Sequence, residues 1–249
     1  MPLVNSEVAR RFVEQVLKWS RSRQLRSAEC FTVDSTSIES WASLKSLKKK
    51  GARSPKDGGA GTGMVDFKGE RRTNSTHEST TDAEVKVMRR GWGAAAKQSI
   101  ARHALMENRN WLCADLQTTD ARLAEPKAAE RMLTQQRRRR IRPISVGADK
   151  GDCTRTFVTH LRQHEIQPHI APITNQRTPG FDPRTTPHES YRISQRKRKR
   201  AEEIFGWLKT VAGFRKCHSI GIERTQLYAY FAASAYNLLR MSRLTPADT

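Results

Sequence analysis

The sequence predicts an α/β protein in which a mixed β-sheet is flanked by helices. Two observations support this fold class: short apolar runs typical of buried strands come first, and strand-like and helix-like segments then alternate. The chain has 249 residues, and its hydrophobic residues (36%) are spread in periodic patterns. That is enough apolar side chain for a sizeable folded core.

The N-terminal third predicts one helix, one strand and one loop. Apolar residues recur at helical spacing between Val8 and Trp19, and Asn5 stands where a helix cap is expected. Residues 30–34 (CFTVD) predict a short buried strand that ends at an acid. Residues 50–63 are rich in glycine, and we expect a mobile loop there. This loop lacks the Gly-Lys-Ser/Thr pattern of a nucleotide-binding loop.

The rest of the chain predicts a hairpin, an alternating region and two final helices. Residues 100–106 and 111–116 flank a polar turn and predict an antiparallel hairpin. The later elements are expected at residues 128–140 (helix), 144–149 (strand), 154–161 (helix) and 166–171 (strand), then, after a turn-rich stretch at 172–190, at 195–211 and 224–241 (helices).

The charge of the chain indicates a polyanionic partner. Lys and Arg number 46 against 25 Asp and Glu, which leaves a formal net charge of +21. Nucleic acid is the commonest partner of such a basic protein. The sequence has no run of 18 apolar residues, so a membrane partner is not expected. Its four cysteines lie far apart, which predicts free thiols in a reducing cytoplasm rather than disulfides.

Two acids occupy positions where α/β sheets place their chemistry. Asp34 and Asp149 each follow a short apolar strand. Two such carboxylates, with a third acid from a nearby helix, would suit a pair of magnesium ions, which prefer oxygen ligands. For either residue alone, the simpler interpretation is an aspartate that ends a strand or begins a turn. Asp152 is an alternative ligand to Asp149, although no strand leads directly into it.

The predicted helix around residues 196–209 supplies the third acid. Arg198, Glu202 and Lys209 fall within about 40° of one another on a helical projection, so they form one stripe. An acid between two cations suits a metal site beside a phosphodiester backbone. The alternative is a solvated face on which Arg198 and Glu202 form an ordinary i, i+4 ion pair.

Other residues that commonly carry chemistry have simpler explanations. His160 and His164 have the spacing of zinc ligands on a helix, but the intervening residues lack the glutamate of His-Glu-x-x-His. Two surface histidines are therefore expected. Phe205 and Trp207 are expected to pack their helix against the sheet rather than to stack on bases. The basic runs 137–140 and 196–200 are expected to contact DNA phosphates, because they stand near the acids in the sequence.

Three short segments resemble the signature segments of bacterial insertion-sequence transposases, and the insertion-sequence-five type most closely. These are VDST (33–36), GADK (147–150) and EEIFGWLKT (202–210). In this family the acid of each segment belongs to an Asp-Asp-Glu triad in a ribonuclease-H-like domain. The third acid lies in an Arg-x3-Glu-x6-Lys pattern, which Glu202 matches and Glu203 does not. Residues 74–82, 103–108 and 234–239 also resemble the family.

The resemblance implies a DNA transposase with a defined set of site residues. The expected reaction is Mg²⁺- or Mn²⁺-dependent cleavage at the element's ends, followed by strand transfer to target DNA. Two metal ions would be held by Asp34, Asp149 and Glu202. The expected partners are double-stranded DNA (transposon ends and target) and further copies of the chain, in the bacterial cytoplasm at the nucleoid. The residues expected to contact DNA are Arg198, Lys209, Lys150, Arg196, Lys199 and Arg200.

The resemblance also implies how the chain is divided and where it departs from the family. Residues 1–29 are expected to be a helical remnant of a longer N-terminal region, and residues 30–249 the catalytic domain. After GADK the family usually reads Ala-Tyr-Asp, whereas this chain has Gly-Asp-Cys at 151–153. Gln195 stands where the family has a tyrosine. A truncated, inactive DNA-binding remnant of such a transposase is therefore the alternative function.

Overall fold

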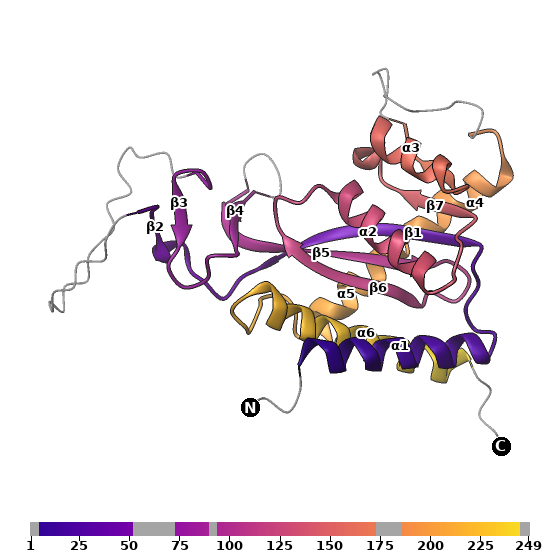
Figure 1. Cartoon of the computed structure of the whole chain (residues 1–249), viewed down its shortest axis with the longest axis horizontal. Helices are drawn as coiled ribbons and strands as arrows, with labels where there is room; N and C mark the ends of the chain where they lie inside the picture. Colours follow the sequence, from indigo (N-terminus) through magenta and orange to yellow (C-terminus); the bar gives the residue numbers. More distant parts are fainter. Residues whose placement is uncertain (1–4, 52–72, 90–93, 173–185, 245–249) are drawn as a thin grey trace, which may run out of the picture.

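In the computed structural model, residues 5–51, 73–89, 94–172 and 186–244 are described. Most of the strands form one six-stranded sheet, in which β6 pairs with β5 and the others follow the order β4-β5-β1-β7-β8 (Figure 1). Its strands are β1 (Cys30–Glu39), β4 (Lys86–Met88), β5 (Lys97–Glu107), β6 (Cys113–Asp120), β7 (Ser145–Ala148) and β8 (Gln167–Ile170). The short strands β2 (Leu47–Lys49) and β3 (His77–Ser79) pair separately.

The sheet is mixed, with β1 at the junction of its two halves. On one side β1 pairs antiparallel with β5, which pairs antiparallel with β6. On the other side β1 pairs parallel with β7, which pairs parallel with β8. Helix α2 (Glu125–Arg138) connects β6 to β7, and α3 (Arg155–Gln163) connects β7 to β8. This is the mixed sheet with flanking helices that the sequence predicts, so the α/β fold class is confirmed.

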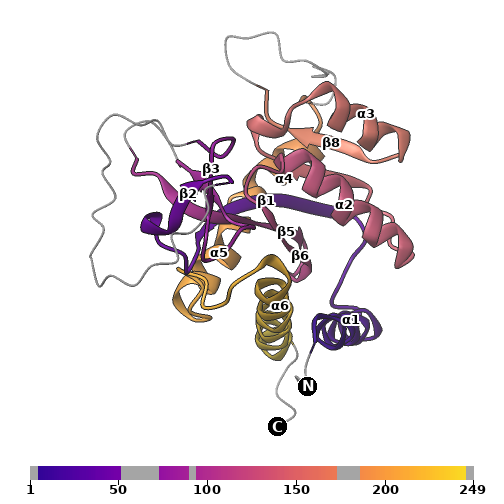
Figure 2. The ribbon, with the colours of Figure 1, turned by 60° about the vertical axis from the view of Figure 1, so that its left-hand side comes forward.

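Helices cover both faces of the sheet, as Figure 2 shows. On one face Phe31 and Val33 pack with Met132 of α2 and Phe157 of α3. On the other face Ala104 packs with α5 (Ala201–Thr210), α6 (Ile222–Leu244) and α1 (Ser6–Ser22). Because successive strand residues point to opposite faces, Asp34 lies on the side of α5 and α6.

The first strand is longer than the sequence predicts. Residues 30–34 were expected to end at Asp34, but β1 continues to Glu39 and pairs with β5 as far as Glu39↔Ser99. The reason is that Ile38 is buried against Ile100 in a separate apolar cluster. Asp34 therefore lies in the middle of a strand, and only its pairing with β7 has ended by that point.

The predicted hairpin is present, with longer strands than expected. Strands β5 and β6 pair from Ile100↔Asp120 to Met106↔Cys113. Trp111, which was expected in the second strand, has φ 61° and belongs to the turn. A positive φ is incompatible with a strand, so the second strand begins at Cys113.

The helix predicted for residues 195–211 is two helices. Helix α4 (Glu189–Arg198) ends within the basic run 196–200, and α5 begins directly after that run, at Ala201. Between them the amide of Arg200 donates to the carbonyl of Lys197, a tighter bond than the i to i−4 bond of an α-helix. The run of Lys and Arg has no apolar side chain that would hold one straight helix on the sheet. The last predicted helix is confirmed as α6.

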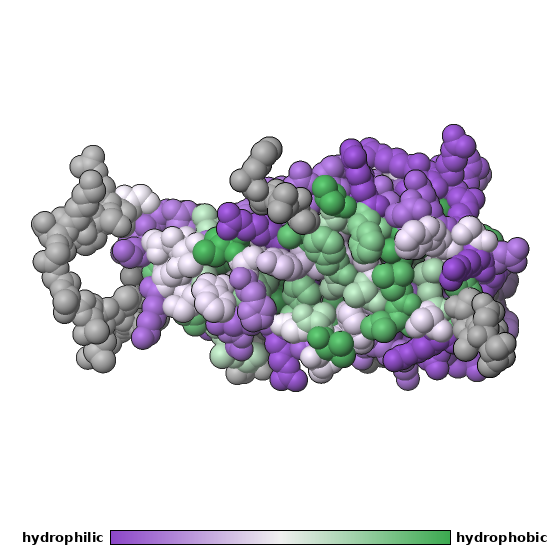
Figure 3. Space-filling view, turned by 90° about the horizontal axis from the view of Figure 1, so that it is seen from below, coloured by the Kyte–Doolittle hydropathy of each residue, from purple (hydrophilic) through white to green (hydrophobic). Residues whose placement is uncertain are grey.

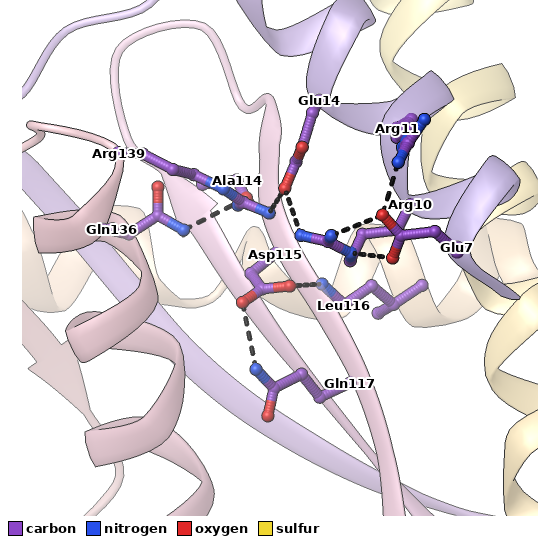
Figure 4. Close-up of polar contacts among 10 residues, drawn as sticks. All are labelled: Glu7, Arg10, Arg11, Glu14, Ala114, Asp115, Leu116, Gln117, Gln136 and Arg139. Carbon is purple, nitrogen blue, oxygen red and sulfur yellow. Dashed lines mark hydrogen bonds and ion pairs between the residues drawn. The ribbon is translucent and has the colours of Figure 1, made fainter.

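Helix α1 is tied to the rest of the fold by polar contacts, drawn in Figure 4. Glu14 accepts from Arg10 of its own helix at 3.1 Å and from Arg139 at the end of α2 at 3.2 Å. Arg139 also donates to the carbonyl of Ala114 in β6. The expected cap is present, since the Asn5 side chain accepts from the Val8 amide at 2.9 Å.

Two predicted loops fall largely outside the described residues. These are residues 52–63 of the glycine-rich segment and residues 173–185 of the turn-rich stretch. The four cysteines are free thiols, and all but Cys30 are buried. Among the described helices, none is both long and apolar enough to span a lipid bilayer.

Candidate functional site

Asp34 and Asp149 lie side by side at the end of the β1–β7 pairing. The last paired residues are Thr32 and Gly147, and each aspartate follows its strand's paired residue by two positions. Parallel strands keep this register, so the two carboxylates leave the sheet at the same level. Each is oriented by the next amide: Ser35 donates to Asp34 at 2.8 Å, and Lys150 donates to Asp149 at 2.7 Å.

The third predicted acid approaches from α5. Glu202 is in the first turn of this helix, which packs on the face of the sheet that carries Asp34. Burial raises the pKa of Asp34, and the nearby charges of Glu202 and Asp149 raise it further, while the Ser35 amide and Arg198 oppose the shift. The three acids predicted from the sequence therefore share one electrostatic neighbourhood.

Arg198 pairs with an acid other than the one its helical spacing favours. Its Nη2 lies 3.5 Å from Oδ1 of Asp149, and only 24% of the side chain is exposed. Arg198 does not form the i, i+4 pair with Glu202 that was the alternative interpretation, because the chain turns between α4 and α5. The ion pair instead joins the end of α4 to the acid that follows β7.

The second cation of the predicted stripe contacts β1. Nζ of Lys209 donates to Oγ1 of Thr36 at 3.0 Å, and the lysine is half-buried. Thr36 is two residues past Asp34 on the same face of the strand. Lys209 lies two helical turns past Glu202, roughly 10.5 Å along the axis of α5. There it can bind a phosphate beside the acids.

The donor set suits a hard divalent cation. Carboxylate oxygens are the ligands that Mg²⁺ prefers, and the mutual repulsion felt at Asp34 is of the kind that a bound cation relieves. Within the described ranges, however, no three His, Cys, Asp or Glu side chains are close enough to hold one ion together. The acids converge, but in this arrangement Asp149 faces Arg198.

Sequence reasoning missed Glu125 as part of the acidic neighbourhood. It begins α2, and burial raises its pKa, with the charges of Asp34 and Asp149 adding to the effect. Its position as the first acid after the hairpin, at a helix start, was the available signal.

Asp152, the alternative to Asp149, has a different environment from its rival. Asp152 as a whole residue is 3% exposed, whereas the side chain of Asp149 is 53% exposed. Burial and then the charge of Glu125 raise the pKa of Asp152 to about 7. Asp149 is therefore the more accessible ligand.

A hydrogen-bonded chain fixes the residue next to Asp34. Nδ1 of His103 lies 2.6 Å from Oγ of Ser35, and Nε2 lies 2.9 Å from Oγ1 of Thr119. Burial lowers the pKa of His103 to about 4, so the imidazole is neutral at pH 7. The side chain of Ser35 is thereby held by His103, while the backbone amide of Ser35 donates to Asp34.

Two adjoining cavities flank β1 beside these acids. The larger, of about 630 Å³, is lined by Ser35 and Glu125, and the other, of about 430 Å³, by Lys209; both reach Ser37 and Met88. Basic side chains line both of them: Arg89 and Arg122 the first, and Lys97, Lys209 and Arg215 the second. The residues that follow Asp34 along β1, together with Glu125, thus border a groove lined by basic side chains, as a phosphodiester strand requires.

The other basic residues predicted to contact DNA divide into two groups. Lys150 directly follows Asp149, Arg196 lies in α4, and Lys199 and Arg200 lie between α4 and α5, where the Arg200 guanidinium is 5.7 Å from the centre of the Trp111 ring. Arg196 contacts Glu189 at 3.4 Å, and Arg200 contacts Glu203 at 3.7 Å.

The run 137–140 is placed elsewhere than expected. The run ends α2, whereas Glu125, which lies near the acids, begins the same helix. The twelve residues from Glu125 to Arg137 span about 18 Å of helix. Arg139 is occupied by Glu14, with 17% of its side chain exposed. The run is close to Asp149 in the sequence but not in space, because β7 runs from the end of the sheet near the run 137–140 to the end where Asp149 lies.

The predicted packing role of Phe205 and Trp207 agrees with the structure. Phe205 is 5% exposed in the core, and Trp207 packs against Tyr236 with ring centroids 5.5 Å apart. His160 and His164, which were expected at the surface, are both half-buried and contact each other edge to face.

Comparison with known proteins adds a family match. A family model described as the transposase DDE domain matches residues 65–238. No curated protein sequence matches the chain. A solved structure titled as a pre-cleavage Mos1 transpososome is similar over 96% of this chain, with 9% sequence identity and a TM-score of 0.27. The chain spans 62% of the length of that structure's chain.

Proposed function

We propose, from the premise that this chain belongs to the family of transposase DDE domains, that it cleaves DNA at the ends of a mobile element and joins the freed 3′ ends to a target. The observation that carries the proposal is that Asp149 and Glu202 act electrostatically on Asp34, in a strand whose next residues line cavities bordered by basic side chains. The insertion-sequence-five type, within this family, is the narrower assignment that the motifs favour.

Each site residue has a role that follows from its chemistry. Asp34, Asp149 and Glu202 would hold Mg²⁺ or Mn²⁺, and two such ions would activate a water or 3′-hydroxyl and stabilise the leaving oxygen. Lys209 binds a phosphate beside them from its position on Thr36. Arg198, which pairs with Asp149 here, would be free to contact a phosphate if Asp149 held a metal ion instead.

The remaining cations position the DNA. Lys150, which follows Asp149, and Arg196, Lys199 and Arg200, which precede Glu202, neutralise the backbone without reading its sequence. Double-stranded DNA, as element end and as target, is the proposed substrate, and the bacterial cytoplasm at the nucleoid is the proposed location. The charge of +21 would bring the chain to DNA by a long-range attraction.

The experiment is a nicking assay on a duplex that carries the ends of the encoding element, with Mg²⁺ or Mn²⁺. Asp34→Asn, Asp149→Asn and Glu202→Gln should each reduce nicking at least ~100-fold, because each removes a carboxylate from the charged site. Glu203→Gln is the matched control. It changes the neighbouring exposed acid of the same helix, and activity should stay within about threefold of the parent.

A mobility-shift titration separates catalysis from binding. The three acid variants should bind the same duplex as tightly as the parent, since their carboxylates contribute no attraction to phosphate. Undiminished nicking in Asp34→Asn or Asp149→Asn would refute the assignment of the triad.

The alternative is a DNA-binding remnant without activity. It is favoured by the ion pair of Asp149 with Arg198 and by the lack of an assembled three-ligand group among the described residues. It predicts binding with no cleavage by the parent chain under either divalent ion. Metal-dependent cleavage by the parent would exclude it.

A further inference from the structure

A separate cavity, of about 230 Å³, lies between the second half of α1 and the end of α2, at the opposite end of α2 from Glu125. Figure 3 views the molecule from the side on which α1 and α6 lie, where hydrophilic surface borders a hydrophobic middle. The cavity is lined by four basic side chains, one acid and two apolar side chains: Lys18, Arg21, Arg26 and Arg139, then Glu14, then Leu17 and Ile141. We call it the basic cavity.

The ends of the two helices bring these residues together. The four that come from α1 are separated by three, one and three positions, which places them on one face of the helix: Glu14, Leu17, Lys18 and Arg21. After α1, Gln24 has φ 57°, and the Leu25 amide donates to the Ser20 carbonyl. This turn reverses the chain and returns Arg26 to the side of the helix. The chain turns in the same way after α2, where Arg140 has φ 58°.

The acid of the basic cavity does not neutralise its cations. Glu14 accepts from Arg139 at 3.2 Å, but it also accepts from Arg10, outside the cavity, at 3.1 Å (Figure 4). The other three cations of the cavity form no ion pair with any acid in the part of the chain that the structure describes. One shared carboxylate therefore faces four positive charges.

Two buried nitrogens at the basic cavity lack an acceptor. Nη1 of Arg26 and Nε of Arg139 are buried, and neither has a hydrogen-bond partner among the described residues. Burial lowers the pKa of Arg26 to about 10, and the charges of Arg139 and Arg21 lower it further. Glu107 opposes this shift, but its carboxylate oxygens already accept from three other groups. Because buried polar groups are nearly always hydrogen-bonded, the cavity fits an anion that the chain does not supply.

We propose that the basic cavity binds the phosphate group of a small phosphorylated molecule. A phosphate accepts paired hydrogen bonds from guanidinium groups, which the three arginines of the cavity can offer. Its charge would offset the excess of cations. Leu17 and Ile141 supply apolar surface on which the organic part of the ligand packs.

The size of the basic cavity favours a small ligand over a DNA duplex. Its volume of about 230 Å³ lies below the roughly 300–1,000 Å³ of pockets for drug-sized molecules. The site is also distinct from the cation-lined groove beside β1, with which it shares no lining residue. The inference goes beyond the proposed function and does not rest on it.

The test is isothermal titration calorimetry of the whole chain at low salt, with inorganic phosphate and adenosine monophosphate as the probes. Adenosine monophosphate should bind with a dissociation constant of about 100 µM, and inorganic phosphate about tenfold more weakly, because it has no organic part to pack on the apolar residues. Each probe should also raise the melting temperature, since it binds only where the folded chain joins α1 to the end of α2.

Two variants and a matched control assign the binding to the basic cavity. Arg26→Met and Arg21→Ala should each weaken the binding of adenosine monophosphate by at least ~10-fold. Arg26→Met removes a buried charge without an ion-pair partner, so the unliganded variant should melt at or above the temperature of the parent. If it unfolds instead, the exposed Arg21 still tests the cavity. Arg23→Ala removes the same charge from an exposed residue outside the cavity lining, and affinity should stay within about twofold.

Three results would overturn the proposal. The first is no heat of binding and no rise in melting temperature with either probe up to about 10 mM. The second is binding of adenosine monophosphate by folded Arg26→Met and Arg21→Ala that is as tight as binding by the parent. The third comes from a short DNA duplex, which the parent and Arg26→Met should bind equally. A selective loss of duplex affinity in Arg26→Met, absent from Arg23→Ala, would assign the cavity to the path of DNA instead.

Discussion

Asp152 shows how a single buried carboxylate can make folding depend on pH. Its pKa is raised to about 7 in the folded chain by burial and by Glu125, from an ordinary value of 3.8. The folded state therefore holds this proton more tightly than the unfolded state does. Between pH 4 and 7 the unfolded chain has already lost the proton, so the contribution of Asp152 to stability falls as the pH rises through this window.

We predict that Asp152→Asn abolishes this part of the pH dependence. Relative to the variant, the parent should lose on the order of 2 kcal/mol of unfolding free energy between pH 5 and pH 8. Urea unfolding at the two pH values measures the difference, and titrations shared by both chains cancel. Equal losses in the two chains would show that Asp152 ionises normally in the folded state.

At the scale of elements, the site depends on the close approach of α4 to β7. A Cβ added to Gly147 would lie 2.9 Å from Oγ of Ser194 in α4 and 3.3 Å from Oγ1 of Thr32. Only a residue without a side chain allows this approach. Because Arg198 ends α4, the position of the helix also determines the ion pair with Asp149.

Gly147→Ala should therefore lower stability by about 1–3 kcal/mol and reduce nicking, because α4 must move away from the sheet. Ser194→Ala is the matched compensating change, since the buried Oγ of Ser194 has no hydrogen-bond partner. In the double variant the melting temperature should return most of the way to that of the parent. If Ser194→Ala gave no recovery, the contact between α4 and β7 would not be the cause.

At the scale of the whole molecule, the net charge of +21 predicts strongly salt-dependent DNA binding. If the five cations that line the two cavities each neutralise a phosphate, log K should fall with log salt at a slope of roughly −4 to −5. Filter binding or fluorescence anisotropy at several salt concentrations measures this slope.

Arg215→Ala should make that slope shallower by about one unit, because it removes one phosphate contact from the smaller cavity. Arg142→Ala removes an equal charge before β7, at the end of the strand opposite Asp149, and serves as the control. Similar slopes for both variants would mean that charge alone, and not the groove, determines binding.

The local pattern of the chain was enough to predict most of its main elements and the position of Asp149 after a strand. Two strand-like runs around a polar turn predicted the hairpin, and the strand that delivers Asp149 was expected from residues 144–149. These features depend on neighbours in the sequence, which is why they can be read from it. The order of the motifs added Glu202, although its contribution to catalysis stays a prediction.

Only the tertiary structure decided which groups meet. It divided the predicted helix between Arg198 and Ala201 and so directed Arg198 to Asp149. It brought Glu125 to the acids and carried Arg139 away to Glu14. These outcomes depend on strand pairing and helix packing between residues far apart in the chain, and no local pattern records them.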